Sequence, residues 1–310
     1  MKMMLLGGAG FIGTNLAKAL ALGNSITIVD KNEDYFANIK SLELPDITYT
    51  VSELLPETDY EELVEGQELV YHLASTTVPT TSNQHISQEL NANVVMSSNL
   101  LEACVHQGVK KVVFFSSGGT VYGKEVGCPL AEATPTNPIS SYGIQKVTIE
   151  KLLYLYQYLY GLDYRIIRLS NPYGPYQRPN GILGAVTTFT YKALKREEIE
   201  VYGDGSVVRD FIFIEDAIRG VLNIVNGKTS HRTFNLGSGQ GTSINDVLKT
   251  VSVTLGIKLN VRYREGRKVD VPVNYLDISR YESAYGNLSP ISLAEGIWRT
   301  AQFMRENYII

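Results

Sequence analysis

Tyr142 and Lys146 are the side chains of this sequence best placed for acid–base chemistry. They stand four residues apart, which puts both on one face of a helix. A free phenol has a pKa of about 10 and is a poor base at neutral pH. A neighbouring ammonium favours the phenolate and lowers that pKa, so the pair could take a proton from an alcohol and return it. Because the spacing is common, a surface tyrosine beside a surface lysine is the simpler alternative.

A glycine-rich stretch at the N-terminus has the spacing of a phosphate-binding turn. Residues 7–13 read Gly-Gly-Ala-Gly-Phe-Ile-Gly, after an apolar run and before a helical pattern. Gly8, Gly10 and Gly13 match the G-x-G-x-x-G dinucleotide fingerprint, and Gly7, Gly10 and Gly13 match a variant of it. Glycines allow positive φ and close approach of a pyrophosphate, and the helix N-terminus offers it N–H groups. A purely structural glycine turn is the alternative.

Asp30 stands twenty residues after Gly10, at the end of the second apolar run. A carboxylate there accepts hydrogen bonds from the ribose hydroxyls of NAD and disfavours the 2′-phosphate of NADP. Lys31 could tolerate that phosphate, so NADP stays the minor alternative. We expect NAD, whose positive nicotinamide ring would add to Lys146 in favouring the phenolate.

Strand-like and helical patterns alternate through the first half of the chain. Apolar runs that predict strands occupy residues 3–6, 25–29, 69–73, 112–115 and 164–169, and helical patterns occupy 93–107 and 145–160. Such alternation predicts an α/β fold, a doubly wound parallel (Rossmann) sheet whose strands are buried on both faces.

The composition of the sequence changes after Asn171. Pro172, Pro175 and Pro179 fall within eight residues, which predicts the start of a second, smaller α/β lobe. We therefore expect a NAD-binding domain over residues 1–170 and a substrate lobe over 171–310. Strand-like runs at 211–214 and 233–236 predict that the chain returns to the sheet near 207–240, so the two parts are interleaved.

Composition excludes several classes of protein. The 310 residues are 44% hydrophobic with a net charge of −4, which excludes dominant disorder and gives no general attraction to nucleic acid or anionic lipid. The longest apolar runs fall short of the ~20 residues that cross a bilayer. The histidines and two cysteines have no ligand spacing, so no metal is expected. The sequence predicts a cytoplasmic protein.

The whole chain resembles the extended short-chain dehydrogenase/reductase family, within it the nucleotide-sugar epimerases, dehydratases and reductases typified by UDP-glucose 4-epimerase. The motifs that carry the resemblance are the glycine turn with Asp30, His72-Leu73-Ala74, Asn93, Ser116-Ser117-Gly118-Gly119-Thr120-Val121-Tyr122-Gly123, Tyr142 with Lys146, Ser170-Asn171-Pro172-Tyr173-Gly174-Pro175, Gly203-Asp204-Gly205 with Arg209-Asp210, and Arg267 with Asp270.

The resemblance implies roles for these residues. The cofactor would contact Gly7, Gly10, Phe11, Ile12, Gly13, Asp30, Lys31, Leu73, Ala74, Asn93, Ser116, Tyr142 and Lys146. Asn171 would bind near the phosphates of a nucleotide-sugar, Arg209 and Arg267 would grip its diphosphate, and Asp270 would hold a ribose hydroxyl. Guanidinium forks suit a diphosphate. The alternatives are an ion pair of Arg209 with Asp210 or Asp216, and a solvated basic cluster around Arg267.

One position departs from the family pattern. The family usually carries a Ser or Thr four residues before the tyrosine of Val-Tyr-Gly, where its hydroxyl orients the C4 oxygen of the sugar, and here that position is Gly118. Ser117, slightly preferred, or Thr120 could supply the hydroxyl. The carboxylate pair that the dehydratase branch places next is Gly119-Thr120 here, which argues against a dehydratase.

The resemblance implies a NAD-dependent 4-epimerase of a UDP-hexose such as UDP-glucose/UDP-galactose or the N-acetyl forms, in polysaccharide biosynthesis. The alternative enzyme is a NAD(P)-dependent 4-keto-6-deoxyhexose reductase acting on a dTDP-, GDP- or CDP-sugar. A non-catalytic dinucleotide-binding regulator is a third class, against which Tyr142 and Lys146 argue.

The helical pattern over 145–160 is apolar or aromatic on most faces. Such a helix is buried on most faces, which fits cover by its own sheet and by a second subunit, as in the homodimers of the family. Burial beneath the second lobe is the alternative.

Overall fold

Seven parallel strands form the central sheet of the computed structural model, which describes residues 1–79, 81–124, 127–179, 184–266 and 271–308. The order across the sheet is β11 (Thr233–Leu236), β6 (Asp163–Leu169), β5 (Lys111–Ser117), β4 (Leu69–His72), β1 (Lys2–Leu6), β2 (Ser25–Asp30) and β3 (Ile47–Val51). The order reverses direction at β1, so the crevice that binds ligands in open α/β sheets lies at the carboxyl ends of β1 and β4.

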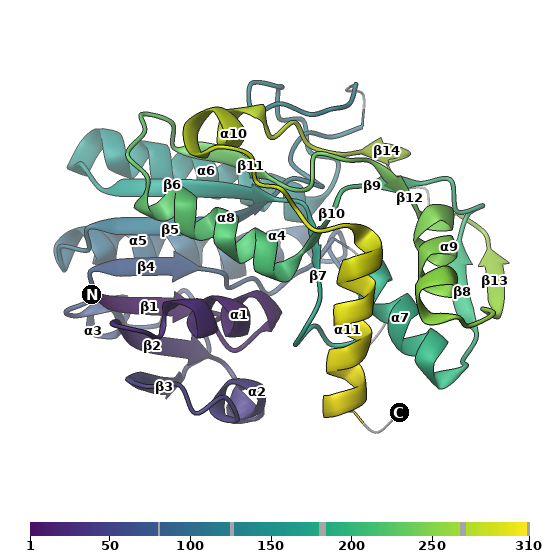
Figure 1. Ribbon diagram of the computed structural model, residues 1–310. Coiled ribbons are helices and arrows are strands. Elements are labelled where there is room, and N and C mark those ends of the chain that lie inside the picture. Colours follow the sequence, from purple (N-terminus) through teal and green to yellow (C-terminus); the bar gives the residue numbers. More distant parts are fainter. Residues whose placement is uncertain (80, 125–126, 180–183, 267–270, 309–310) are drawn as a thin grey trace.

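Helices cover both faces of this sheet (Figure 1). One face carries α1 (Phe11–Leu20), η1 (Glu33–Phe36), α2 (Ala37–Lys40), α8 (Ile214–Asn226) and α10 (Ser279–Tyr285). The other carries α3 (Tyr60–Val64), α4 (Ile86–Leu90), the π-helix η2 (Asn91–Val95), α5 (Met96–His106) and α6 (Ser141–Tyr160). The predicted doubly wound sheet is confirmed.

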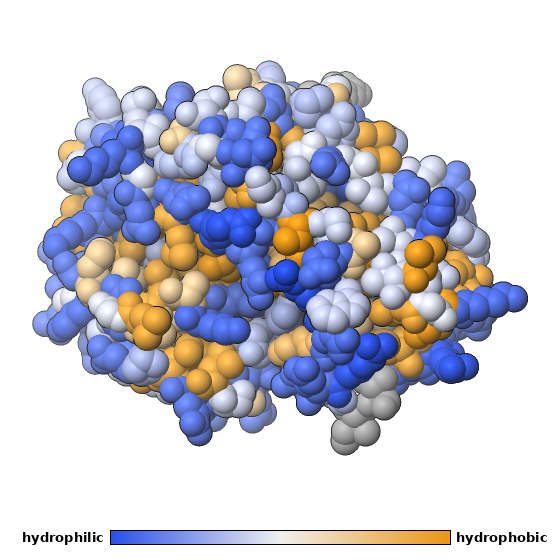
Figure 2. Space-filling view, viewed as in Figure 1, coloured by the Kyte–Doolittle hydropathy of each residue, from blue (hydrophilic) through white to orange (hydrophobic). Residues whose placement is uncertain are grey.

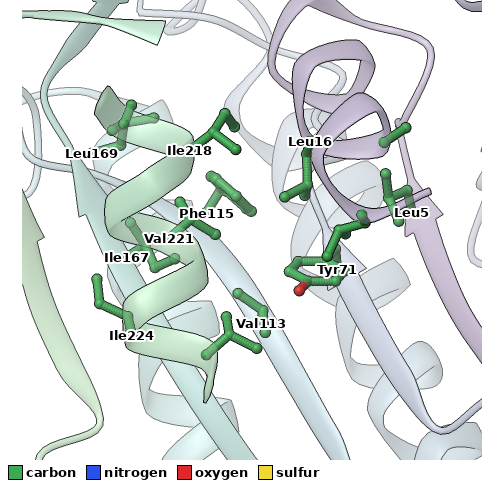
Figure 3. Packing of buried hydrophobic residues seen from close by; sticks show 14 of the residues in the cluster. Leu5, Leu16, Tyr71, Val113, Phe115, Ile167, Leu169, Ile218, Val221 and Ile224 are labelled. Atoms are coloured by element: carbon green, nitrogen blue, oxygen red, sulfur yellow. The ribbon is translucent and has the colours of Figure 1, made fainter. Parts of the chain in front are cut away.

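Alternate strand residues enter opposite cores. Leu5 and Phe115 pack with α1 and α8, where strand and helix side chains point toward one another (Figure 3), whereas Leu6 and Phe114 pack under α5 and α6. The strands are apolar at consecutive positions because parallel strands of this kind are buried on both sides.

A second lobe lies beside the carboxyl ends of the strands (Figure 1). Its own core lies between three helices and short strands. The elements are β7 (Asn171–Tyr173) paired with β10 (Phe211–Phe213), β8 (Ile199–Tyr202) paired with β13 (Val261–Arg264), a sheet of β12 (Thr242–Ser243), β9 (Val208–Arg209) and β14 (Val273–Asn274), and the helices α7 (Ala185–Lys195), α9 (Ile244–Leu255) and α11 (Leu293–Asn307).

The chain passes between the lobes more often than the sequence indicates. It returns to the central sheet through α8 and β11, and α10 packs there as well. The expectation that residues 211–214 rejoin that sheet is wrong, because β10 pairs with β7 in a separate two-stranded sheet. β10 ends where α8 begins, so it leads directly into that helix.

Two helices differ from their predicted bounds. The helix expected over 93–107 is α5 preceded by the π-helix η2, so Asn93 lies in a widened turn. The helix expected from 145 begins at Ser141, because the Ser140 side chain accepts a hydrogen bond from the Gly143 N–H and caps it. Tyr142 therefore stands in the first turn of α6.

The exposed surface is not uniform in polarity. On the face that carries α1, α8 and α11, hydrophobic side chains form separate patches between hydrophilic ones (Figure 2). On α6, Tyr158 is 74% exposed, so the second lobe does not cover the helix at that residue. No helix in the described ranges has the length and apolar character that a bilayer span requires.

Candidate active site

The glycine turn between β1 and α1 uses its glycines in different ways. Gly7 has φ of +72°, and a Cβ on it would lie 2.8 Å from the Cα of Ala74. A Cβ on Gly13 would overlap the carbonyl of Gly8, so the helix packs directly on the turn. At Gly10 the nearest atom would lie 3.6 Å away, an ordinary contact. The protein itself does not require glycine there, whereas a pyrophosphate approaching the backbone would.

The N-terminus of α1 opens beside this turn. Gly10 is the N-cap residue, and no side chain caps the helix. The first N–H groups of a helix lack intrahelical partners, and the helix dipole adds partial positive charge there. Phe11 lines the adjoining cavity. An uncapped helix end facing a cavity suits the phosphates of a dinucleotide.

A cavity of about 490 Å³ adjoins the glycine turn and has walls from both lobes. Its lining includes the predicted cofactor residues Gly7, Gly10, Phe11, Asp30, Lys31, Leu73 and Ala74. The Asp30 carboxylate accepts hydrogen bonds from the N–H groups of Ala9 (3.1 Å) and Lys31 (2.9 Å), which hold it at the cavity wall. The volume is typical of a small-molecule site.

Several lining residues escaped the sequence analysis. Tyr35, Asn38, residues 52–54 and Arg178 belong to no motif. The Arg178 guanidinium lies 4.7 Å from the ring centroid of Tyr35, so a loop of the second lobe meets η1 at the cavity. Because 143 positions separate the two residues, no local pattern could have indicated the contact.

Three predicted cofactor residues lie behind the cavity lining. Asn93 is buried; its amide donates to the Thr76 hydroxyl and accepts from the Thr76 N–H, both at 2.8 Å. Ser116 donates to the Glu150 carboxylate at 2.6 Å, and Glu150 forms a buried ion pair with Arg168 at 2.6 Å. Ile12 packs against the hydrophobic core. These side chains support the site from outside it.

Lys146 is buried directly beneath the end of β5. Its Nζ donates to the Phe115 carbonyl at 2.9 Å and lies 4.7 Å from the Phe114 ring centroid and 5.4 Å from that of Tyr142. Burial lowers the pKa of Lys146 to about 8, and the negative charge of Glu150 opposes that fall. The ammonium therefore faces the Tyr142 ring, as the spacing predicted.

The expected effect on the phenol is wrong for the protein alone. Burial raises the pKa of Tyr142 to about 12, and no compensating fall from Lys146 is resolved. Desolvation penalises the phenolate more than an ammonium over the ring face stabilises it. The cavity described above stops at Thr76 and Val78 and does not reach Tyr142.

The structure explains the glycine at position 118. A Cβ there would lie 2.6 Å from Leu276 Cδ1 and 3.1 Å from the Arg168 carbonyl oxygen, inside the core. A serine at 118 would therefore collide with the core. Ser117 is half-buried at the end of β5, and the Thr120 Oγ1 is buried with no hydrogen-bond partner in the part of the chain that the structure describes.

The predicted substrate residues fall into two groups. Asn171 donates to the Asp210 carbonyl at 2.9 Å, and Arg209 Nη1 donates to the carbonyls of Val208 (2.9 Å) and Val271 (2.6 Å). The two carboxylates weighed as partners of Arg209 have other contacts: Asp210 accepts from Ser238 N, Ser238 Oγ, Gly239 N and Leu276 N, and Asp216 pairs with Arg219. Arg267 and Asp270 lie outside the described residues.

Comparisons with known proteins agree with this geometry. A family model described as NAD dependent epimerase/dehydratase family matches residues 3–237. The UDP-glucose 4-epimerase of Mycolicibacterium smegmatis is 32% identical over 309 residues, covering 98% of this chain and 99% of that protein.

Two solved structures are similar over almost their full lengths. The UDP-glucose 4-epimerase of Thermotoga maritima with UDP-glucose has a TM-score of 0.90 at 31% identity, covering 99% of both chains. The UDP-glucuronic acid 4-epimerase of Bacillus cereus, in complex with UDP-glucuronic acid and NAD, has a TM-score of 0.88 at 27% identity, covering 99% of this chain and 100% of that one.

Proposed function

The chain belongs to the NAD dependent epimerase/dehydratase family, and on that premise we propose that it is a 4-epimerase of a UDP-hexose, either UDP-glucose and UDP-galactose or their N-acetyl forms. Membership makes it an enzyme of the extended short-chain dehydrogenase/reductase type with NAD as cofactor. The observation that carries the proposal is the Tyr142 phenol over a buried Lys146 at the carboxyl edge of the sheet. Similarity to a UDP-glucose 4-epimerase over almost the whole chain supports it.

The residues at the glycine turn fit NAD. The open backbone at Gly10 and the uncapped N-terminus of α1 would bind the pyrophosphate. Asp30, held by two backbone N–H groups, would accept from the ribose hydroxyls of the adenosine. A bound NAD would supply the reversible hydride acceptor for C4 of the sugar.

Tyr142 acts as the base and then as the acid in this proposal. Its phenolate oxygen takes the proton of the sugar's C4 hydroxyl as C4 is oxidised, and the resulting phenol gives that proton back as C4 is reduced on the other face. Lys146 stabilises the phenolate, and its bond to the Phe115 carbonyl fixes where its charge lies. Because burial alone raises the pKa of Tyr142 to about 12, the base also needs positive charge brought by the cofactor.

A hydroxyl near Tyr142 would orient the C4 oxygen. We assign this role to Thr120 ahead of Ser117, because the Thr120 Oγ1 is buried and has no partner among the described residues. An unpaired buried hydroxyl costs about 1–3 kcal/mol, which a substrate oxygen would relieve. Arg209 and Asn171, with Arg267 and Asp270, would hold the nucleotide diphosphate and its ribose.

The protein is further proposed to form a homodimer through α6. Ile144, Leu155 and Leu159 share one face of this helix and are 45%, 44% and 54% exposed. Val95, at the end of η2, is 41% exposed and extends the apolar surface. Exposed apolar side chains on one helix face mark candidate interfaces. Leu155→Glu should convert a dimer to a monomer in light scattering; a wild type that is already monomeric contradicts the assignment.

Turnover without added reductant tests the proposed activity. Wild-type enzyme incubated with UDP-glucose or UDP-N-acetylglucosamine should produce the 4-epimer, and Tyr142→Phe should abolish turnover while NAD binding survives. Tyr156→Phe is the matched control, since its hydroxyl lies on the same helix but contacts Ser98. Consumption of NADH with a 4-keto-6-deoxy sugar, and no epimerisation, would identify a reductase instead.

A further inference from the structure

Gln145 has a buried side-chain amide and lies on the same turn of α6 as Tyr142. Among the described residues, this amide forms no hydrogen bond with the central sheet or with the glycine turn. Its side chain is 2% exposed. The Nε2 group donates to Ser141 Oγ at 2.9 Å and to Glu89 Oε2 at 3.4 Å, and Oε1 accepts from Thr77 Oγ1 at 3.2 Å. All of its described polar contacts lead to the segment that follows β4 or to the start of α6.

Glu89 is the second buried member of this group, at 7% exposure. Its carboxylate accepts from the N–H groups of Asn83 (3.4 Å) and His85 (3.2 Å). Hydrogen bonds from Ser141 and from these backbone groups hold the pKa of Glu89 below its usual range despite the opposing effect of desolvation. Glu89 is therefore ionised at neutral pH and joins residues 83–85 to the start of α6.

A third contact ties the same two regions. Asn83 adopts φ of +81°, and its Oδ1 accepts from the Ser141 N–H at 2.7 Å. This bond satisfies one of the orphan N–H groups at the N-terminus of α6. Residues 77, 83 and 89 of one connecting segment thus all form hydrogen bonds with the first turns of α6, which carry Tyr142.

That connecting segment also forms part of the cofactor cavity. Thr76 and Val78 line the cavity, and Thr77, between them, is the residue bonded to Gln145. Asn93 fixes Thr76 from the opposite side. The contacts of Gln145 with Thr77 and Glu89 therefore join this wall of the cavity to the helix turn that carries Tyr142.

We propose that Gln145 and Glu89 are positioning residues for the reaction: they clamp the cavity wall at residues 76–78 to the first turn of α6 and so set the Tyr142 hydroxyl against the reacting carbon. The inference rests on the proposed function, because a reacting carbon there presupposes it. Misplacement of reacting groups by about 1 Å can cost about 100-fold in rate. The Asp30 carboxylate is held by the N–H groups of Ala9 and Lys31 and not by the clamp, so we expect affinity for NAD to depend little on it.

Gln145→Met tests the clamp, because methionine keeps the length and apolar volume but makes no strong hydrogen bond. We expect kcat to fall by about 10- to 100-fold, with KM and NAD affinity within about 3-fold of wild type. Backbone amides of residues 76–78 and 81–89 should exchange faster with solvent. Gln67→Met is the matched control: it removes a half-buried amide at the opposite end of β4, bonded to Thr27 at 3.3 Å, and should leave both measurements unchanged.

The reciprocal exchange Glu89→Gln with Gln145→Glu restores one carboxylate and one amide in swapped places. Its kcat should exceed that of Gln145→Met by at least about 5-fold, because the exchange restores the contact between a carboxylate and an amide. It also serves as the test protein if Gln145→Met does not fold. A folded Gln145→Met enzyme with wild-type kcat overturns the proposal, as does a reciprocal exchange with no gain.

The two proposals fail in different ways. If the wild-type protein does not epimerise UDP-hexoses, the proposed function is wrong. The hydrogen exchange of residues 76–78 and 81–89 then decides the clamp: protection unchanged between wild type and Gln145→Met overturns it, and lost protection supports it.

Discussion

Replacing Gly118 by serine restores the residue type that the family usually has at this position, and we expect it to damage the protein. The backbone of Gly118 is fixed by its N–H bond to the Leu169 carbonyl at 2.8 Å. From there a Cβ would lie 2.6 Å and 3.0 Å from the two terminal carbons of Leu276 and 3.1 Å from the Arg168 carbonyl oxygen. Leu276 is fully buried.

The size of the effect follows from this overlap. Overpacking a rigid core costs about 1–3 kcal/mol of the free energy of unfolding. For a chain of this length, 1 kcal/mol corresponds to about 2 °C in Tm, so Gly118→Ser should lower Tm by about 2–6 °C. Leu276→Ala alone should cost about 2–5 kcal/mol by leaving a cavity.

A double-mutant cycle isolates the contact. Because Leu276→Ala removes the carbons that the new Cβ meets, the double variant should be more stable than the sum of the two losses predicts, by about 1–3 kcal/mol. Denaturant unfolding of the four proteins measures this coupling. Gly118→Ala is the matched control, because it adds the Cβ without the hydroxyl. It should lower the free energy of unfolding by at least the amount that the overlap of the Cβ with Leu276 costs.

The reasoning is refuted if Gly118→Ser is as stable as wild type, or if the two substitutions are additive. A rise in kcat on Gly118→Ser would contradict it as well, since the hydroxyl would then reach the sugar rather than the core.

Three further predictions concern the cavity and the buried lysine. Gly7→Ala should lose at least about 2 kcal/mol in denaturant unfolding and weaken NAD in titration calorimetry, because φ of +72° strains alanine and its Cβ meets the Ala74 backbone; an unchanged NAD affinity contradicts this. Arg178→Ala should speed NAD release in stopped-flow fluorescence by about 5-fold, the equivalent of a 1 kcal/mol contact with Tyr35, and an unchanged rate would show that the bridge does not close the cavity. The pH dependence of stability should carry the signature of Lys146. Its pKa is about 8 in the folded protein and about 10.4 in an unfolded chain, so the unfolded state binds more protons between these values. The free energy of unfolding of wild type, relative to Lys146→Met, should therefore rise with pH over this window by up to about 3 kcal/mol, and a fall would contradict the buried ammonium.

Local spacing made the glycine turn, Asp30 and the Tyr142–Lys146 pair readable in the sequence. Each depends on a short stretch: a turn that needs positive φ, a strand end, and one turn of helix. The alternation of apolar runs and helical patterns likewise made the doubly wound sheet predictable, because a strand that is buried on both faces is apolar at consecutive positions.

Only the tertiary structure decided what surrounds these groups. The Arg178–Tyr35 bridge, the block at Gly118 by Leu276 and the grip of Glu89 on Gln145 join residues far apart in the chain, and no local pattern encodes such contacts. The raised pKa of Tyr142 in the protein alone has the same origin. Spacing reveals the charge of a neighbour, but desolvation depends on every segment packed around the phenol, and that is known only once the chain is folded.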